Sequence, residues 1–211
     1  MTKNTVEIVE KTTPFKGYLQ VDHYLLKHVL HEGGWSDVIS REVVERGHIA
    51  AVLLYDPDLD LFVLVEQFRP AAFAAKESPW WGEDFSPWMV ECVAGIIEDG
   101  ENPEEMCRRE SMEEANCPVS ALHQIYQFFP SPGCMTESVF LFCGRVDASK
   151  AGGIFGLKEE GEDIRVFTAT PEETYEMLEQ GRIANAVTML AVQWFQLNRD
   201  KLRHIWLGEA A

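Results

Sequence analysis

The sequence predicts a mixed α/β protein of the α+β kind, and three observations support this. Residues 14–66 carry β-branched and aromatic residues between turn signals, as expected for a run of strands. A helix with clear start and stop residues follows over 103–115, and two further helices close the chain. With 211 residues, 46% of them hydrophobic, the chain can bury a substantial core as one large domain or as a domain with a smaller partner layer.

The strands of the first half are expected to form a meander. Segments 17–29 and 40–56 flank the turn "HEGGW", and "LFVLVEQF" follows the turn signal "DPDLD". Stretch 76–88 contains three tryptophans, two prolines and a glycine, which predicts an ordered surface loop that packs on a partner. "MVECVAG" then predicts a short strand that ends at Gly95.

The helix over 103–115 has the best-marked ends. Asn102 is a suitable N-cap, a proline follows it, and Glu105 can reach back to the N-cap backbone. Asn116 can adopt the left-handed conformation that ends a helix, and a proline two residues later forbids continuation.

Strands are predicted after this helix over 123–129, 138–146 and 165–169, and a mobile acidic loop over 154–164. Thr170 begins a capping box, and the helix that it starts is expected to end at Gly181. The last helix should cover 185–202. Its buried face is expected to hold the residues spaced by three and four positions, namely Val187, Leu190, Ala191, Trp194 and Leu197.

The net charge and the cysteine content limit the classes of function and the cellular compartment that we expect. A formal net charge of −17 without a basic stripe argues against a nucleic-acid surface, so an anionic substrate would need cations or a few well-placed arginines. The five cysteines are scattered, which predicts buried free thiols in a reducing compartment. No signal segment or long apolar stretch is apparent, and we expect a soluble cytoplasmic protein without membrane contact.

Three carboxylates crowd one side of the helix over 103–115. Glu110, Glu113 and Glu114 stand at i, i+3 and i+4, so they repel one another unless a cation lies between them. Arg109 and Glu113 could form one i, i+4 ion pair. On these residues alone, a solvated acidic face and a metal site both remain open.

The wider spacing resembles the Nudix signature: a glycine, five residues, Glu, seven residues, Arg-Glu, an apolar residue, any residue, Glu-Glu, any residue, a glycine and an apolar residue. The matched positions are Gly95, Glu101, Arg109, Glu110, Glu113 and Glu114. Ser111, Asn116 and Cys117 depart from it. Asn116 can make the turn of the missing glycine, and Ser111 should weaken helix packing without removing a ligand.

This resemblance implies a Nudix α/β/α sandwich with a mixed sheet, plus a small N-terminal antiparallel β layer. We expect the layer over 1–46 and the catalytic domain over 47–211. The resemblance implies Mg²⁺, with Mn²⁺ as the other candidate, bound by Glu110, Glu114 and the carbonyl of Ala94. Arg109 would orient the glutamates, and Glu113 would act as a ligand or in support of the ligands, as would Glu101.

Within that family the chain resembles bacterial ADP-ribose pyrophosphatases, through "ERGHIAAVLLYD", "LVEQFRPAAF", "SPGCMTES" and "EEGEDIRV". Pro132 resembles a feature that marks ADP-ribose hydrolysis. Arg69 would grip the diphosphate, although a strand-end salt bridge is the alternative. Glu137 would bind the ribose side. Tyr18 would lie against the adenine or else be a half-buried strand aromatic, and Arg41 would reach in from the N-terminal layer.

The resemblance also implies a general base on the loop before the capped helix. Glu160 fits best, Glu159 and Glu162 are close rivals, and an acidic surface loop is the simpler alternative. Gly161 would permit loop closure.

The implied reaction is Mg²⁺-dependent hydrolysis of ADP-ribose to AMP and ribose 5-phosphate by a homodimer that exchanges its N-terminal layers. Hydrolysis of another nucleoside diphosphate sugar, or a non-catalytic Nudix-like ligand sensor, are the alternatives. A sensor usually lacks some of the glutamates, and none is missing here.

Overall fold

The computed structural model describes residues 5–82 and 85–208, and the chain divides into two compact units. The first unit holds the chain up to His48 together with Phe129–Ser138. The second holds Ile49–Phe128 and the chain from Val139 onward. The segment Phe129–Ser138 groups with the first unit although it lies far along the chain. The expected division into a layer over 1–46 and a catalytic domain over 47–211 stays a prediction.

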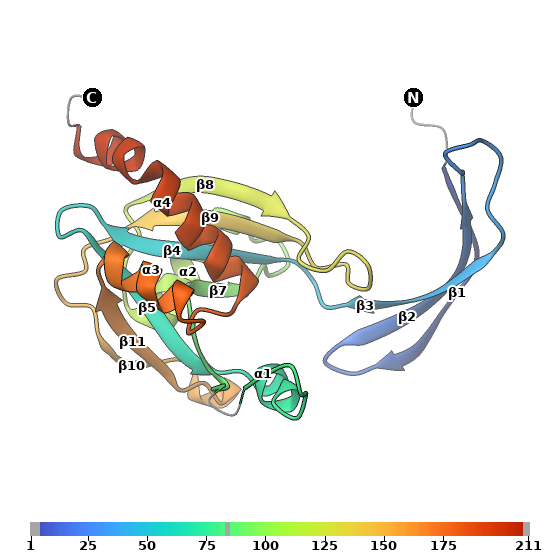
Figure 1. Ribbon diagram of the computed structural model, residues 1–211, viewed down its shortest axis with the longest axis horizontal. Helices are drawn as coiled ribbons and strands as arrows, with labels where there is room; N and C mark the ends of the chain where they lie inside the picture. The colour runs from blue at the N-terminus through green and yellow to red at the C-terminus, as the bar shows by residue number, and fades with distance from the viewer. Residues whose placement is uncertain (1–4, 83–84, 209–211) are drawn as a thin grey trace. The chain divides into compact units, whose positions relative to one another are not determined.

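The first unit is built on a three-stranded antiparallel sheet in the order β1-β2-β3, drawn as a long ribbon in Figure 1. Its strands are β1 (Val6–Lys16), β2 (Gln20–His28) and β3 (Ile39–Glu45). The prediction that strands begin at residue 14 was wrong, because β1 starts eight residues earlier. Every residue of β1 is exposed within this chain. The strand therefore lacks the buried apolar face that the sequence pattern could have indicated.

The second unit contains one mixed sheet with the strand order β10-β11-β5-β4-β9-β8, while β6 pairs with β5 and β7 pairs with β4. Strands β4 and β9 are parallel, and the other pairs are antiparallel. The strands are β4 (Ile49–Asp56), β5 (Leu61–Phe68), β6 (Trp88–Glu91), β7 (Val93–Ile96), β8 (Ala121–Phe128), β9 (Val139–Arg145), β10 (Gly153–Phe155) and β11 (Ile164–Ala169).

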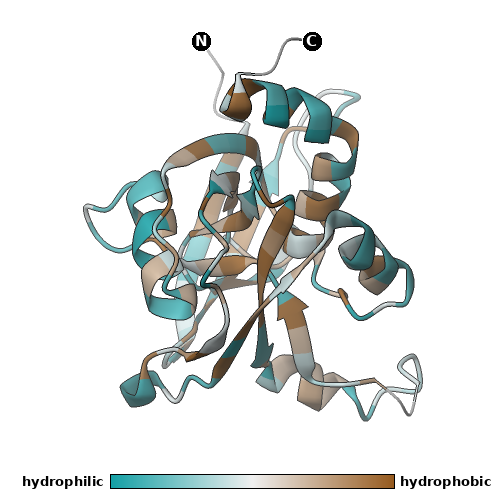
Figure 2. Ribbon diagram, turned by 90° about the vertical axis from the view of Figure 1, so that its left-hand side faces the viewer, coloured by the Kyte–Doolittle hydropathy of each residue, from teal (hydrophilic) through white to brown (hydrophobic). Residues whose placement is uncertain are grey.

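Helices cover both faces of this sheet, which makes three layers (Figure 1). Helix α2 (Pro103–Ala115) packs on one face through Met106, Cys107 and Ala115. Helices α3 (Pro171–Glu179) and α4 (Ala186–Leu207) pack on the other face. In Figure 2 the hydrophobic segments run along the central strands, and the helices alternate between hydrophobic and hydrophilic segments, as amphipathic helices do. The predicted mixed α/β sandwich with a small antiparallel sheet is confirmed.

Several predicted boundaries were wrong. The strand expected to end at Gly95 is two strands, β6 and β7, and the second continues through Gly95 to Ile96. A short helix, α1 (Pro70–Ala75), precedes the tryptophan-rich stretch 76–88, of which residues 83–84 lie outside the described residues. The expected acidic loop over 154–164 includes part of β10 and one turn of 3-10 helix, η1 (Lys158–Glu160).

The helix ends confirm the local predictions. Asn102 accepts hydrogen bonds from the backbone N–H groups of Glu104 and Glu105, and Glu105 completes the capping box. Asn116 ends α2 in the left-handed conformation, with φ 50°. Thr170 forms the expected capping box of α3.

The predicted buried face of the last helix was partly wrong. Leu197 is 85% exposed, whereas Thr188, Val192 and Phe195 are buried along with the expected Ala191. Two neighbouring faces of this long helix both carry apolar residues at three- and four-residue spacing. The sheet selects the stripe that includes Phe195, whose ring packs on Tyr55 and Phe62.

Four of the five cysteines are buried free thiols, as predicted, but Cys134 is exposed in the first unit. Cys92 illustrates the buried class, because burial raises the pKa of its thiol to about 12. None of the helices in residues 5–82 and 85–208 combines the length and the hydropathy that crossing a bilayer requires.

Candidate active site

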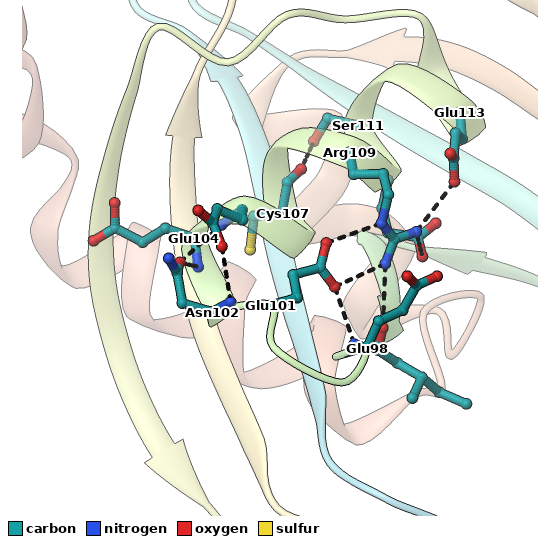
Figure 3. Close-up of polar contacts among 11 residues, drawn as sticks. Glu98, Glu101, Asn102, Glu104, Cys107, Arg109, Ser111 and Glu113 are labelled. Atoms are coloured by element: carbon teal, nitrogen blue, oxygen red, sulfur yellow. Dashed lines mark hydrogen bonds and ion pairs between the residues drawn. The ribbon is translucent and has the colours of Figure 1, made fainter.

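Arg109 on α2 holds three glutamates in place (Figure 3). Its Nε and Nη2 donate to the two carboxylate oxygens of Glu101 at 2.9 and 3.1 Å. Its Nη1 donates to Glu110 at 2.7 Å and to Glu113 at 3.2 Å, the ion pair that the i, i+4 spacing suggested. Arg109 lowers the pKa of Glu101 through these hydrogen bonds, so this carboxylate stays ionised. The expected orienting contacts of Arg109 are therefore present.

Glu110 depends on the glycine of β7 that faces it. A Cβ added to Gly95 would lie 2.0 Å from Oε1 and 2.4 Å from the carboxyl carbon of Glu110, closer than any side-chain atom can stand. Only glycine leaves room for this carboxylate to lie against the strand backbone. Gly95 therefore has a role beyond turning the chain, because β7 continues through it.

Glu114 lies one turn further along α2 and is almost completely buried, with 3% of its surface exposed. Its carboxylate faces the same strand, and the N–H of Ala94 donates to Oε2 at 3.4 Å. The pKa of Glu114 is raised to about 8, first by burial and then by the nearby carboxylates of Glu110 and Glu162, against the opposing effect of the Arg69 cation. Burial likewise raises the pKa of Glu110. This side of α2 thus holds two buried carboxyl groups whose ionised forms are disfavoured until a cation approaches.

A divalent cation fits this donor set. Residues 5–82 and 85–208 contain no group of three or more His, Cys, Asp or Glu side chains that is arranged to hold a metal by itself. Two carboxylates, a backbone carbonyl and water form the open, oxygen-rich shell that Mg²⁺ uses. The glycine gap and the repulsion between Glu110 and Glu114 favour such an ion. Ligation by the Ala94 carbonyl remains a prediction.

Arg69 follows β5, and its guanidinium binds Glu91 within the electrostatic reach of Glu114. Its Nε and Nη2 lie 2.9 and 2.5 Å from Oε2 of Glu91, which is 2% exposed. The other oxygen of Glu91 accepts a hydrogen bond from Asn185 at 2.9 Å. Burial lowers the pKa of Arg69, but its neighbours Glu91, Glu114 and Glu162 raise it more, so the guanidinium stays charged. The strand-end salt bridge therefore exists, and its cation acts on the carboxyl group of Glu114 in α2.

The candidate bases differ in their surroundings, and Glu159 is exposed in η1 like its neighbour. Glu160 is exposed in η1. Glu162 is half-buried, accepts a hydrogen bond from the N–H of Leu157 at 2.9 Å and packs on Gly156. Glu162 also lies close enough to Glu110 to raise its pKa. Of these candidates, Glu162 is the residue whose charge acts on the carboxyl groups of Glu110 and Glu114.

Four predicted substrate-binding residues lie in the first unit. Tyr18 occupies the turn between β1 and β2 and is 86% exposed, so the half-buried alternative was wrong. Arg41 on β3 is also exposed and donates to the carbonyl of Ser40 at 2.7 Å. Pro132 is exposed, whereas Glu137 is buried and paired with Arg46. The roles of these four residues remain predictions.

Sequence reasoning missed Glu91 and Arg46. A single acid between apolar residues in "MVECV" was the available signal for Glu91, since a buried charge needs a partner. No comparable local signal marked Arg46, because its partner lies 91 positions further along the chain.

The chain is similar to known proteins over most of its length. The family model described as NUDIX domain matches residues 45–197. The ADP-ribose pyrophosphatase of Escherichia coli (strain K12) is 41% identical over 204 residues, covering 97% of this chain and 94% of that protein. The ADP-ribose pyrophosphatase of Haemophilus influenzae (strain ATCC 51907 / DSM 11121 / KW20 / Rd) is 38% identical over 205 residues, covering 97% and 92%.

Two more distant proteins are also similar to this chain, one in sequence and one in fold. The GDP-mannose pyrophosphatase of Cronobacter sakazakii (strain ATCC BAA-894) is 35% identical over 161 residues, covering 74% of this chain and 78% of that protein. A crystal structure of an ADP compounds hydrolase superimposes with a TM-score of 0.68 at 14% identity, covering 96% of this chain and 99% of that chain. At that identity the superposition supports the fold alone.

Proposed function

The chain belongs to the Nudix family, and from this premise we propose that it hydrolyses the diphosphate of ADP-ribose to AMP and ribose 5-phosphate. One observation carries the proposal: the relatives named ADP-ribose pyrophosphatase match 97% of this chain, well beyond the Nudix domain. In this reaction a water oxygen bonds to one phosphorus while the bond from that phosphorus to the bridging oxygen breaks. The buried thiols agree with a reducing cytoplasm as its location.

Glu110 and Glu114, with the Ala94 carbonyl, are the residues that would hold Mg²⁺ or Mn²⁺. Such an ion neutralises diphosphate charge and lowers the pKa of bound water. Arg109 keeps Glu110 and Glu113 oriented through the ion pairs described above. The guanidinium of Arg69 supplies a charged, planar donor to a phosphate oxygen, and Glu91 keeps it extended toward the site.

The general base is proposed on the loop that contains Glu160 and Glu162. The sequence favours Glu160, whereas the electrostatic influence of Glu162 on Glu110 and Glu114 supports Glu162. The chosen carboxylate accepts a proton from the attacking water, which needs a position within about 3 Å of that water or one intervening water.

A second substrate class has one supporting observation. GDP-mannose pyrophosphatases are 30–35% identical to this chain, over about three quarters of it. Another nucleoside diphosphate sugar therefore remains the alternative substrate. A panel of ADP-ribose, ADP-glucose and GDP-mannose, each assayed with Mg²⁺, with Mn²⁺ and with EDTA, tests the proposal. We expect ADP-ribose to give the highest kcat/KM and EDTA to abolish turnover; a clear preference for GDP-mannose would refute the proposed substrate.

A homodimer that shares its sites is the proposed assembly. The first unit exposes apolar residues on its sheet, among them Ile8, Val9 and Phe15, each more than half exposed. Such a surface usually packs against another layer. If the layer is exchanged, mixing Arg41→Ala chains with Glu114→Gln chains should restore activity, because half of the heterodimer sites would be intact. Activity equal to the average of the two parents, or a fully active monomer in sedimentation, would contradict the shared site.

A further inference from the structure

Glu91 has protein partners on both of its carboxylate oxygens. It is the last residue of β6 and is 2% exposed. Its Oε2 accepts from Nε and Nη2 of Arg69, and its Oε1 accepts from the side-chain amide of Asn185 at 2.9 Å. The terminal torsion of a glutamate is soft, so a partner on one oxygen alone would leave the carboxylate free to rotate. Because each oxygen has a partner, the orientation of the carboxylate is fixed, and with it the orientation of the arginine.

Asn185 is itself held by the first turn of α4, of which it is the N-cap. Its Oδ1 accepts from the N–H groups of Val187 and Thr188 at 2.8 and 3.1 Å, while its Nδ2 donates to Glu91. The reversed amide would place its N–H groups against two N–H donors and its oxygen against a carboxylate, so these partners allow only one orientation. Asn185 therefore connects the start of a helix to the buried carboxylate that binds Arg69.

The same turn of α4 also fixes the backbone next to Glu91. The chain changes its strand partner here, because β6 pairs with β5 and β7 pairs with β4. Cys92 lies between the two strands, and its N–H donates to Oγ1 of Thr188 at 3.0 Å. A buried N–H without a partner would be costly, so this contact stabilises the strand junction. Two consecutive residues of the junction thus depend on contacts with α4.

Arg69 keeps part of its guanidinium available for a ligand. Within residues 5–82 and 85–208, Nε and Nη2 donate to Glu91 and Nη1 donates to no protein group. The side chain is 40% exposed, so a ligand can reach it. A planar guanidinium that is held along one edge presents its other N–H groups in a set direction, which suits a phosphate oxygen. Without the fixed edge, the long side chain would sample several rotamers.

We infer that Asn185 is a positioning residue for the diphosphate, because its amide holds Glu91 in the orientation that fixes Arg69. The inference rests on the proposed function and adds to it a residue that acts on phosphate recognition from the far end of the chain. Asn185 acts through Glu91 and is not among the residues proposed to contact the substrate or the metal. If Asn185 served only as a helix cap, any residue that caps α4 equally well would replace it without loss of activity.

Serine separates the two roles of Asn185. Serine and asparagine are about equally good N-cap residues, so Asn185→Ser keeps the start of α4. The shorter side chain has no amide to reach Glu91, whose Oε1 loses its partner. Asn198 on the same helix is the matched control, because its Nδ2 donates to the carbonyl of Trp194 at 2.8 Å instead of to Glu91. Asn198→Ser should therefore leave kcat/KM unchanged.

A double-mutant cycle with Arg69→Met tests whether Asn185 acts through Arg69. The kcat/KM for ADP-ribose is measured for wild type, for each single variant and for the double variant, and thermal unfolding checks that each protein is folded. We expect Asn185→Ser to lower kcat/KM by about tenfold in the wild-type background, the lower end of the range for a hydrogen bond to a charged group. In the Arg69→Met background the same substitution should change kcat/KM by less than about twofold, because the arginine that it positions is absent.

A folded Asn185→Ser variant with nearly wild-type kcat/KM overturns the inference. An equal loss in the two backgrounds also overturns it, because a purely structural effect multiplies with the loss of Arg69. If Asn185→Ser does not fold, Asn185→Asp takes its place in the cycle, since ionised aspartate caps a helix but cannot donate to Glu91.

The substrate panel distinguishes failure of the inference from failure of the proposed function. A wild-type protein that prefers GDP-mannose refutes the proposed substrate alone. The same cycle on GDP-mannose then decides the inference, since both compounds contain a diphosphate. A wild-type protein that hydrolyses neither compound refutes the proposed function and the inference together.

Discussion

Replacing Glu114 by glutamine tests the centre of the proposed metal site. Glutamine has the size of glutamate, a similar helix propensity, and an oxygen that can still accept the N–H of Ala94. The substitution therefore removes one charge and one strong metal ligand from α2 with little change in packing. We expect turnover to fall by at least about 10³-fold at saturating Mg²⁺, because the remaining donors hold the ion poorly.

The burial of Glu114 also predicts how stability depends on pH. In the metal-free folded protein its pKa is about 8, against an ordinary value of 4.5. Between these values the folded state keeps a proton that the unfolded chain releases, so this group's contribution to stability falls as pH rises. The loss is about 1.4 kcal/mol for each pH unit in that window. Glutamine does not titrate, so its contribution is constant.

Thermal unfolding in EDTA measures this directly. Relative to wild type, Glu114→Gln should gain roughly 3–5 °C in Tm for each pH unit between about pH 5 and pH 8. Added Mg²⁺ should raise the Tm of wild type, more strongly at pH 8 than at pH 6 because the ion displaces the proton, and should barely affect the variant. Glu104→Gln is the control, since Glu104 is exposed on the same helix. A Tm difference that does not change with pH would refute the raised pKa, and nearly normal turnover would refute the metal assignment.

Three further predictions concern separate parts of the chain. Gly95→Ala should displace the carboxylate of Glu110, because the new Cβ would stand 2.0 Å from its oxygen. The Mg²⁺ concentration for half-maximal activity should therefore rise by about tenfold or more, and an unchanged Mg²⁺ titration would contradict the close contact. Glu162→Gln should lower kcat by about 10²- to 10⁴-fold with little change in KM if Glu162 is the base, and Glu160→Gln should then be nearly silent; the reverse result would assign the base to Glu160. In the native protein a thiol reagent should modify Cys134 rapidly and the buried cysteines only after denaturation, and rapid modification of several cysteines would show that the core is not packed as described.

The sequence by itself determined the helix ends and the helical spacing, because these depend on residues a few positions apart. The start of α2 at Asn102, its capping box and its left-handed end at Asn116 follow from side chains that hydrogen-bond within a few positions. The same holds for the capping box at Thr170. The spacing of Glu110, Glu113 and Glu114 also required only the geometry of one helix, so the candidate site on α2 could be recognised before the fold was known.

Only the tertiary structure decided which of these groups are buried and what they face. The periodicity of α4 allowed two stripes, and contact with the sheet chose the one that leaves Leu197 in solvent. The pairing of Glu91 with Arg69 and Asn185 joins segments up to 94 positions apart, and the Arg46–Glu137 pair joins two segments of the first unit. Local propensity carries no information about such partners, because desolvation and charge compensation depend on which distant segments the folded chain brings together.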